Sequence, residues 1–382
     1  MRRVSVFLVL VLLSGLLPLH GHAAQPEVGG KSALLMEVSS GTILFESNAH
    51  EPLAPASVTK VMTMLLIMEA IDEGRIGWDD TVTTSEASAA KGGSQVYLKV
   101  GETMTVTDML KSIAVSSAND CACAMAEHIA GSEEAFVAQM NQKAAELGME
   151  DTHFVNCTGL DDGENAAEHR TSAHDIALMS RQLLKNHPDI KKFTTIWMDT
   201  IRNGTFGLSN TNKLVRFYQG ATGLKTGFTS GAGYCLSATA QRDGMELIAV
   251  VMGAETSASR NAACKQLLDY GFANYALIQP ELPESEPIPV KLGKADTVDA
   301  VLGEEGGILI EKAQKNAVSM DLTVEQSVTA PVSQGQRLGT LAVRAGDQIL
   351  KEIPLVAAGG VERMDFGDLF TMVLKRAAMA KI

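Results

Sequence analysis

Ser57 and Lys60, in the stretch APASVTKVMTMLLIMEAI, form a Ser-x-x-Lys pair at the start of a long apolar run. Side chains at positions i and i+3 of a helix lie on the same face, so the amine and the hydroxyl can hydrogen-bond. A serine hydroxyl is a weak nucleophile at neutral pH until a neighbouring base takes its proton. Lysine can be this base when apolar surroundings lower its pKa. The pair therefore predicts a nucleophile, Ser57, with Lys60 as its general base.

The Ser-x-x-Lys spacing occurs a second time, at Ser88 and Lys91, so the spacing alone does not locate a site. Lys91 is followed by two glycines and a polar stretch, which favours an ordinary solvated lysine. By contrast, Ser57 and Lys60 begin a run that is apolar almost all round, and a helix of this kind is buried. Because a buried ammonium is unfavourable unless its charge is paired or removed, the first pair is the better candidate for chemistry.

Two further motifs, Ser117-Ala118-Asn119 and Lys225-Thr226-Gly227, carry groups that complement a serine nucleophile. The first lies at the break between two predicted helices. It offers a hydroxyl that can relay a proton and an amide that can bind a substrate backbone. Alternatively, it only caps the next helix. The second lies in a β-prone run, where Gly227 permits close approach of a ligand and its neighbours can meet an anionic group. The Ser-x-Asn spacing recurs at 259–261, so it is a weak indicator alone.

A metal centre is not predicted. Several potential ligands gather between residues 153 and 174, namely His153, Asp161, Asp162, Glu164, His169 and His174. The histidines do not follow the spacings typical of zinc sites, and the acidic residues do not match a calcium-binding EF-hand loop. We therefore expect neither a metal nor any other cofactor.

The elements that must position these groups follow from hydrophobic periodicity and turn residues. Residues 33–46 indicate a β-hairpin around Ser-Ser-Gly, and the apolar helix after Ser57 comes next. Further helices are predicted over 105–130 (two, interrupted near Ser116–Asp120), 132–149 and 171–186, and three strands and a last helix over 221–277. Strands at both ends with helices between them predict one α+β domain that its own termini close.

The rest of the chain differs in composition. Residues 279–289 are rich in Pro and Glu, as in a linker, and 290–356 have short alternating runs separated by Gly. We predict a catalytic domain over 25–278, a small β-rich domain over 284–357, and an amphipathic helix over 361–382. The apolar face of this helix either lies on a membrane surface, with Lys375, Arg376 and Lys381 near lipid phosphates, or packs against the β-rich domain.

Residues 1–24 are typical of a secretory signal, because a basic start precedes an apolar run and small residues that offer a cleavage point. Gly15 and Pro18 interrupt the run, which disfavours a retained membrane span. We therefore expect an exported protein.

Composition excludes one class of partner. Of the 382 residues 45 are acidic and 32 basic, and this net charge of −13 disfavours a nucleic-acid partner. The five cysteines are odd in number and irregularly spaced, which favours buried thiols over a disulfide framework.

The order Ser-x-x-Lys, Ser-x-Asn, Lys-Thr-Gly resembles that of penicillin-binding proteins and active-site serine β-lactamases. Longer strings are similar to the low-molecular-mass D-alanyl-D-alanine carboxypeptidases of the peptidase S11 family: APASVTKVMT, VSSANDCACAMAEHIAGSEEAFVAQMN, LGMEDTHFVNCTGLDD, GLKTGFTSGAGYCLSATA and CKQLLDYGFANY. The resemblance covers about residues 30–278. It implies a serine β-lactamase/transpeptidase-like fold, an antiparallel sheet flanked by helices, followed by a small all-β domain and the amphipathic helix.

The resemblance also implies a role for each residue of the first two motifs. Ser57 would attack the peptide carbonyl between two D-alanines and become the acyl-ester, with Lys60 as general base. Ser117 and Asn119 would assist proton transfer and hold the substrate.

The later motifs would bind and polarise the substrate. Lys225 would polarise the site, with Thr226 near the terminal carboxylate. Arg260 falls where the family often places an arginine for this carboxylate; a surface arginine is the competing interpretation. The oxyanion hole would be the N–H groups of Ser57 and Phe228, the latter following Gly227. Many relatives have histidine in place of Phe228, and because a backbone donor is indifferent to its side chain, the departure bears on the pH profile rather than on the reaction.

The predicted activity is therefore removal of the terminal D-alanine from peptidoglycan pentapeptides, with β-lactam antibiotics as covalent inhibitors. A D,D-endopeptidase, a β-lactamase and a non-catalytic β-lactam sensor are the alternatives. No clear deacylating glutamate motif supports a β-lactamase, and no signalling span supports a sensor. The expected location is extracytoplasmic, peripheral on the outer face of the cytoplasmic membrane.

Overall fold

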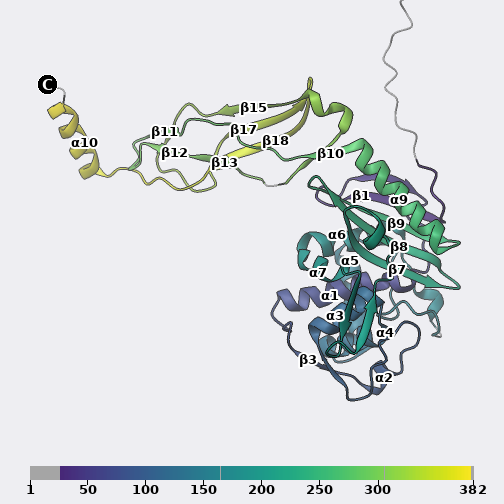
Figure 1. Ribbon diagram of the computed structural model, residues 1–382. Helices are drawn as coiled ribbons and strands as arrows, with labels where there is room; N and C mark the ends of the chain where they lie inside the picture. Colours follow the sequence, from purple (N-terminus) through teal and green to yellow (C-terminus); the bar gives the residue numbers. More distant parts are fainter. Residues whose placement is uncertain (1–25, 164, 305, 380–382) are drawn as a thin grey trace, which may run out of the picture.

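The computed structural model describes residues 26–163, 165–304 and 306–379, and the predicted signal at 1–24 lies outside them. A larger part of sheet and helices leads into a slender β-rich part that ends at helix α10 (Figure 1). The larger part is built on a five-stranded sheet in the order β2-β1-β9-β8-β7. Its strands are β1 (Ser32–Glu37), β2 (Ile43–Ser47), β7 (Ala221–Thr229), β8 (Gly233–Arg242) and β9 (Met245–Ala254).

The N-terminal hairpin closes this sheet, because β1 pairs antiparallel with β2 on one side and with β9 on the other. The hairpin predicted over 33–46 is therefore confirmed, as are the three strands predicted after residue 221. Asp243 and Gly244, between β8 and β9, have φ of 49° and 79°, and positive φ at both positions is typical of a tight hairpin turn.

Helices cover both faces of the sheet, so neighbouring strand residues alternate between two hydrophobic clusters. Leu34 and Val250 belong to the larger cluster, whereas Leu35 and Val251 pack with α9. The helices of the larger cluster are α1 (Lys60–Asp72), α3 (Val106–Ser116), α4 (Asn119–Ala130), α5 (Glu133–Glu146) and α6 (Ala173–Asn186), and α9 spans Ser257–Asn274. The predicted α+β domain, with helices flanking an antiparallel sheet, is confirmed.

Several short elements are too brief for hydrophobic periodicity to predict. They are β3 (Thr81–Thr83), β4 (Thr103–Thr105), β5 (Met198–Ile201), β6 (Phe206–Ser209), α2 (Glu86–Ala89), α7 (Lys191–Thr194), α8 (Leu214–Phe217) and the 3₁₀ turns η1 (Ala56–Thr59), η2 (Ala166–Glu168) and η3 (Pro188–Ile190). One of them changes the expected geometry, because Ser57 lies in η1 and Lys60 is the first residue of α1.

Helix α1 is buried on every side, as its composition predicts. All its residues from Lys60 to Met68 are buried. It packs against α6, α4 and α3. The break predicted between the next two helices is also present: α3 ends at Ser116, Ser117 adopts φ of 63°, and α4 begins at Asn119. A left-handed non-glycine residue is uncommon, and it turns the chain sharply between the two helices.

The β-rich part begins earlier than its composition indicates. β10 (Tyr275–Ile278) follows α9 directly and pairs with β14 (Ile308–Glu311), while residues 279–287 contain no helix or strand. The remaining strands form a four-stranded sheet, β13-β18-β17-β15, and a three-stranded one, β12-β11-β16. Their bounds are β11 (Ile288–Lys291), β12 (Thr297–Val298), β13 (Ala300–Leu302), β15 (Val318–Val324), β16 (Val328–Thr329), β17 (Arg337–Ala345) and β18 (Gln348–Ala357), with η4 at Lys312–Ala317.

Helix α10 (Phe366–Met379) lies at the far end of the β-rich part (Figure 1). Residues 361–364 still belong to that part, since Val361 pairs with Val332 and Arg363 with Gly293. The apolar side chains of α10 that the structure describes are largely exposed: Phe366 at 84%, Phe370 at 58%, Val373 at 59% and Leu374 at 54%. Packing of this face on the β-rich part is therefore not observed.

The side chains of residues 376–379 and the whole of 380–382, with Arg376 and Lys381 among them, lie outside what the structure describes. Among the described residues, no helix combines the length and apolarity needed to cross a bilayer.

At Gly159 the chain passes so close to η1 that only glycine fits. It has φ of 82°, and a Cβ would lie 1.8 Å from the carbonyl oxygen of Ala56. Gly159→Ala should lower the free energy of unfolding by at least about 2 kcal/mol, through backbone strain and the steric clash. Chemical denaturation measures this effect. Gly163→Ala is the matched control, since a Cβ there meets nothing within 4 Å; equal stability of the two variants would contradict the prediction.

Candidate active site

Ser57 and Lys60 are in direct contact. The Lys60 Nζ donates to the Ser57 Oγ at 3.0 Å and to the Thr158 carbonyl oxygen at 2.7 Å. Ser57 follows Ala56, whose φ of 48° turns the chain into η1. The predicted nucleophile and base are thus brought together at the head of the buried helix, although the pair spans a 3₁₀ turn rather than one regular α-helix.

Burial sets the charge of Lys60. Its side chain is wholly buried, and desolvation lowers its pKa from 10.5 to about 7 against the opposing influence of Cys157 and Asp120. Loss of water disfavours the ammonium, so a substantial fraction of the amine is neutral near pH 7. A neutral amine beside a hydroxyl can accept its proton, which is the requirement for a general base.

The Thr158 carbonyl is a part of the site that the residue types did not indicate. Residues 156–159 form a turn in which the Asn156 Oδ1 accepts from the N–H groups of Thr158 and Gly159, at 3.1 and 2.6 Å. The Thr63 hydroxyl of α1 donates to the Cys157 carbonyl at 2.6 Å. A backbone carbonyl has no sequence signal of its own. The only indication in the sequence is that this stretch is one of the strings similar to the S11 peptidases.

Ser117 and Asn119 stand at the break between α3 and α4, and both are buried. The Asn119 Nδ2 donates to the Gly92 carbonyl at 2.7 Å, whereas the Asn119 Oδ1 and the Ser117 Oγ have no hydrogen-bond partner among the described residues. Buried polar atoms without partners are unfavourable and rare. These two atoms are therefore available to a substrate, and neither side chain caps α4 in the way the alternative interpretation requires, since its cap residue is Ala118.

Strand β7 brings the third motif to the same place. A Cβ on Gly227 would lie 2.6 Å from the Pro55 carbonyl oxygen and 3.1 Å from the Ser57 nitrogen, so glycine is needed for this approach. The Thr226 Oγ1 donates to the Thr211 Oγ1 at 2.6 Å, and the Thr211 N–H donates to the carbonyl of Val115, near the end of α3. The strand is thereby tied to both other motifs.

Lys225 is as deeply buried as Lys60. Its Nζ donates to the Thr226 carbonyl at 2.9 Å. Its pKa lies well below the usual value, because of desolvation first and then of the positive charges of Lys60 and Arg260. A bound anion would offset the desolvation and favour the protonated form of Lys225.

Arg260 is not on the surface, so the competing interpretation of this residue is wrong. Its side chain, on α9, is 4% exposed and donates to the Cys235 carbonyl and the Ser257 Oγ, at 3.4 and 3.1 Å. The guanidinium also lies 5.8 Å from the centre of the Tyr234 ring. Its charge acts on Lys225, which places it within electrostatic reach of the β7 motif.

Phe228 points away from the core. Its side chain is 53% exposed and stacks on Tyr234 with 4.2 Å between the ring centres. Because Gly227 brings the backbone of β7 beside the Ser57 nitrogen, the N–H groups of residues 57 and 228 belong to adjacent segments. The phenylalanine side chain does not titrate, and its identity leaves the backbone donors of this segment in place.

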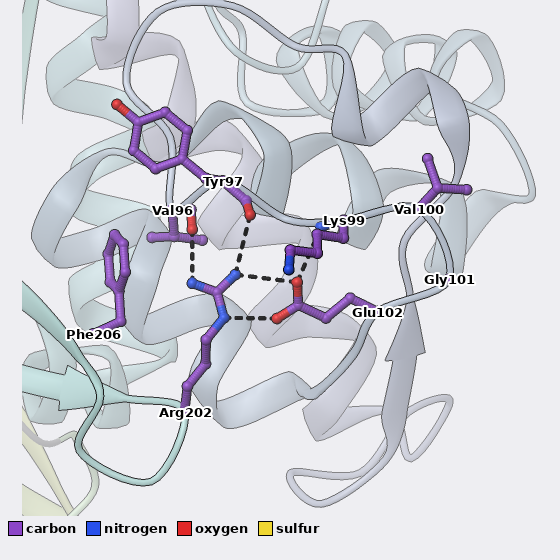
Figure 2. A pocket seen from close by; sticks show the side chains of 8 residues that line it. All are labelled: Val96, Tyr97, Lys99, Val100, Gly101, Glu102, Arg202 and Phe206. Carbon is purple, nitrogen blue, oxygen red and sulfur yellow. Dashed lines mark hydrogen bonds and ion pairs between the residues drawn. The ribbon is translucent and has the colours of Figure 1, made fainter.

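Asp120 and Arg202, which the sequence analysis missed, hold the segment beside Asn119. The Asp120 carboxylate is fully buried and accepts from the N–H groups of Val96 and Leu98, at 3.1 and 3.0 Å. From the other side Arg202 donates to the Val96 carbonyl at 2.8 Å (Figure 2).

Arg202 also pairs with Glu102, at 2.6 Å (Figure 2). Tyr97 and Phe206 border a pocket of about 590 Å³ at this segment. Tyr97 itself has φ of 58° and is 70% exposed. The charged pair therefore secures a strained surface segment next to the Asn119 motif.

The second Ser-x-x-Lys pair is not a site. Ser88 is buried and forms a capping box with Ser85 at the start of α2. Lys91 differs from the prediction of a solvated lysine: its Nζ contacts Glu133 at 2.5 Å, and only 24% of the side chain is exposed. The turn through Gly92 and Gly93 directs Lys91 inward toward the start of α5, which a polar sequence context does not reveal.

The potential metal ligands between 153 and 174 are used elsewhere. The His169 Nε2 shares a hydrogen bond with the Thr59 Oγ1 at 2.8 Å, and the His174 Nδ1 contacts Asp175 at 3.2 Å. Glu164 lies outside the described residues. Within the described ranges, no three His, Cys, Asp or Glu side chains are grouped so that they could hold a metal ion. All five cysteines are free and buried, as predicted.

Comparison with known proteins agrees with this geometry. The D-alanyl-D-alanine carboxypeptidase family, peptidase S11, matches residues 20–256, and the C-terminal domain of penicillin-binding protein 5 matches residues 282–363. D-alanyl-D-alanine carboxypeptidase DacF of Bacillus subtilis is 44% identical over 343 residues, 88% of this chain and 87% of DacF. DacC of Escherichia coli is 33% identical over 365 residues, 92% of this chain and 89% of DacC.

Solved structures give the same result. Penicillin-binding protein 5 of Haemophilus influenzae superposes with a TM-score of 0.73 at 29% identity, over 89% of this chain and 99% of that one. Penicillin-binding protein D2 of Listeria monocytogenes, in its ampicillin-bound form, gives a TM-score of 0.59 at 32% identity over 65% of this chain and 99% of that one. The predicted serine β-lactamase/transpeptidase-like fold is therefore confirmed, and the chain belongs to the S11 peptidase family, the serine-type D-alanyl-D-alanine carboxypeptidases.

Proposed function

We propose that this protein removes the terminal D-alanine from peptidoglycan stem peptides through an acyl-enzyme on Ser57, and that penicillin acylates the same hydroxyl. The observation that carries the proposal is the 3.0 Å contact between the Lys60 amine and the Ser57 hydroxyl, with a Lys60 pKa near 7. The curated relatives bear the name of this activity, and the ampicillin-bound D2 protein shows that a protein of this fold takes a β-lactam.

Acylation begins with proton transfer. Neutral Lys60 takes the Ser57 proton as the Oγ attacks the carbonyl between the two D-alanines. The N–H groups of Ser57 and Phe228 stabilise the oxyanion that develops on this carbonyl. Ser117, whose hydroxyl has no protein partner among the described residues, relays the proton to the departing amine of D-alanine. Water then hydrolyses the ester and restores Ser57.

Substrate binding uses the carboxylate at the C-terminus of the peptide. The terminal carboxylate is an anion, and the buried guanidinium of Arg260 and the amine of Lys225 lie near β7 to receive it. Thr226 adds a hydroxyl on the same strand, and the unpartnered Oδ1 of Asn119 accepts from the substrate backbone. Carboxylate recognition thus selects peptides with a free C-terminus. The names of the curated relatives favour a carboxypeptidase over a D,D-endopeptidase.

The nucleophile can be tested by substitution. Ser57→Ala should lower the release of free D-alanine from a peptide ending in D-Ala-D-Ala by at least about a thousandfold, because the acyl-enzyme cannot form. It should also abolish labelling by a fluorescent penicillin. Ser88→Ala is the matched control, because Ser88 belongs to the second Ser-x-x-Lys pair; it should retain both properties. Release of D-alanine by Ser57→Ala at the wild-type rate would refute the proposal.

The pKa of Lys60 predicts the pH dependence of acylation. The neutral amine is the active form, so the rate constant should rise by about tenfold from pH 6 to pH 8, as expected for a base with a pKa of about 7. His169 does not confuse this profile, because burial, aided by the charges of His153 and Lys60, lowers its pKa to about 4. Stopped-flow acylation by penicillin measures the profile, and a rate that does not change between pH 6 and pH 8 would contradict the role of Lys60.

We further propose that the protein is exported and that α10 lies on the outer face of the cytoplasmic membrane. The large exposed apolar side chains of α10, on a helix too short to span a bilayer, support an interfacial position. Lys375 is exposed on the polar side of the helix and can approach lipid phosphates. The peptidoglycan substrate would then be met outside the cytoplasm.

Truncation tests the tail. Because residues 361–364 bond to the β-rich part, the chain should end at Asp365 rather than before. The shortened protein should pass from anionic vesicles to the soluble fraction in a flotation assay and keep its carboxypeptidase activity. Phe370→Asp should weaken vesicle binding by about tenfold or more through lost apolar burial, and Thr371→Asp much less. Unchanged flotation of the shortened protein would refute the membrane contact.

A further inference from the structure

Glu133 is the centre of a half-buried cluster behind the predicted base. It is the first residue of α5, and its carboxylate is 18% exposed. One oxygen accepts from the Cys157 N–H and thiol, both at 3.2 Å, and the other from the Lys91 Nζ at 2.5 Å and the Cys123 thiol at 3.7 Å. Four donors from three separate segments therefore meet at one carboxylate.

This cluster is linked to Lys60 through the backbone. Glu133 binds the N–H of Cys157, Thr63 binds the carbonyl of the same residue at 2.6 Å, and the next carbonyl, that of Thr158, receives the Lys60 Nζ at 2.7 Å. The segment is held from the α5 side by Glu133 and from the α1 side by Thr63. A shift of the backbone at residues 157–158 would move the acceptor that fixes the Lys60 amine against Ser57.

The charges in the cluster support a fixed acceptor. Burial alone would raise the pKa of Glu133, but the hydrogen bond and charge of Lys91 lower it below its usual value, so the side chain is a carboxylate near neutral pH. The pKa of the Cys157 thiol lies well above its usual value, through its hydrogen bond with Cys123 and burial, so it remains a donor. Lys91 supplies the counter-ion that permits a charged acceptor at this depth.

Glu134 shows that a helix-terminal acid does not suffice for this role. Both glutamates lie in the first turn of α5, where an acid interacts favourably with the helix dipole. Glu134 is exposed, whereas Glu133 turns inward to the Cys157 N–H. The inward contact is therefore specific to residue 133 and is not explained by stabilisation of α5.

We propose that Glu133 is a positioning residue for acylation: its carboxylate holds the backbone at Cys157, and the carbonyl of the next residue, Thr158, aligns the Lys60 amine with the Ser57 hydroxyl. The inference rests on the proposed roles of Ser57 and Lys60.

Two substitutions at Glu133 distinguish the effect of side-chain length from the effect of charge. Glu133→Gln keeps the length of the side chain and an oxygen for the Cys157 N–H, but loses the charge. Glu133→Asp keeps the charge for Lys91 but withdraws the oxygens by one methylene. Positioning predicts that Glu133→Gln acylates within about threefold of wild type and that Glu133→Asp is slower by about ten- to a hundredfold, since small misplacements of a catalytic group have effects of this size. An ion-pair role predicts the reverse order.

The measurement is the second-order rate of acylation by a fluorescent penicillin, with kcat and KM for D-alanine release. Glu133→Asp should lower kcat more than it raises KM, because the substrate-binding groups are elsewhere. Glu134→Ala is the control and should match wild type. Thermal unfolding of each variant establishes that it is folded.

The outcomes are distinct. A Glu133→Asp variant as fast as wild type, or a Glu133→Gln variant equal to or slower than Glu133→Asp, overturns the positioning role while the proposed function stands. Full D-alanine release by Ser57→Ala overturns the proposed function itself, whatever the Glu133 variants do. The expected order of rates, wild type, Glu133→Gln and then Glu133→Asp, supports the inference.

Discussion

A neutral amine inside the protein is the constraint on which this structure depends. Lys60 is enclosed by α1, η1 and the turn at 156–159, and its hydrogen bonds are to one hydroxyl and one carbonyl. In such surroundings the ammonium is disfavoured by several kilocalories per mole, so the pKa falls toward the range in which a base operates. Every layer of the larger part contributes to this enclosure.

The enclosure requires segments that are far apart in the chain to approach closely. Gly227 and Gly159 allow β7 and the 156–159 turn to contact η1 at distances that exclude a Cβ. The left-handed Ser117 turns the chain between α3 and α4, and the Ser117 hydroxyl and the Asn119 Oδ1 find no hydrogen-bond partner in the part of the chain that the structure describes. Strained or crowded backbone at each of these positions is stabilised by the surrounding core, as is common at functional sites.

Behind these groups lies a second set of side chains that touch neither nucleophile nor base. Asp120 and Arg202 bind the backbone of the segment beside Asn119, and Glu133 binds the backbone of the turn that receives Lys60. All three bind main-chain atoms with charged groups, and charge-assisted hydrogen bonds of this kind are strong and directional. The site is therefore built largely from main-chain groups whose orientation buried charges control.

The sequence by itself determined the helix and strand pattern of the larger part and the identity of the motif residues, because periodicity, turn residues and an apolar run around Lys60 are local properties. The resemblance of several strings supplied the family and the roles. Only the tertiary structure decided that Ser57 lies in a 3₁₀ turn, that Arg260 is buried, that Lys91 pairs with Glu133, and that the Thr158 carbonyl holds the base. These features depend on contacts between segments tens to hundreds of residues apart, and a main-chain acceptor or a change in burial leaves no mark in the local sequence.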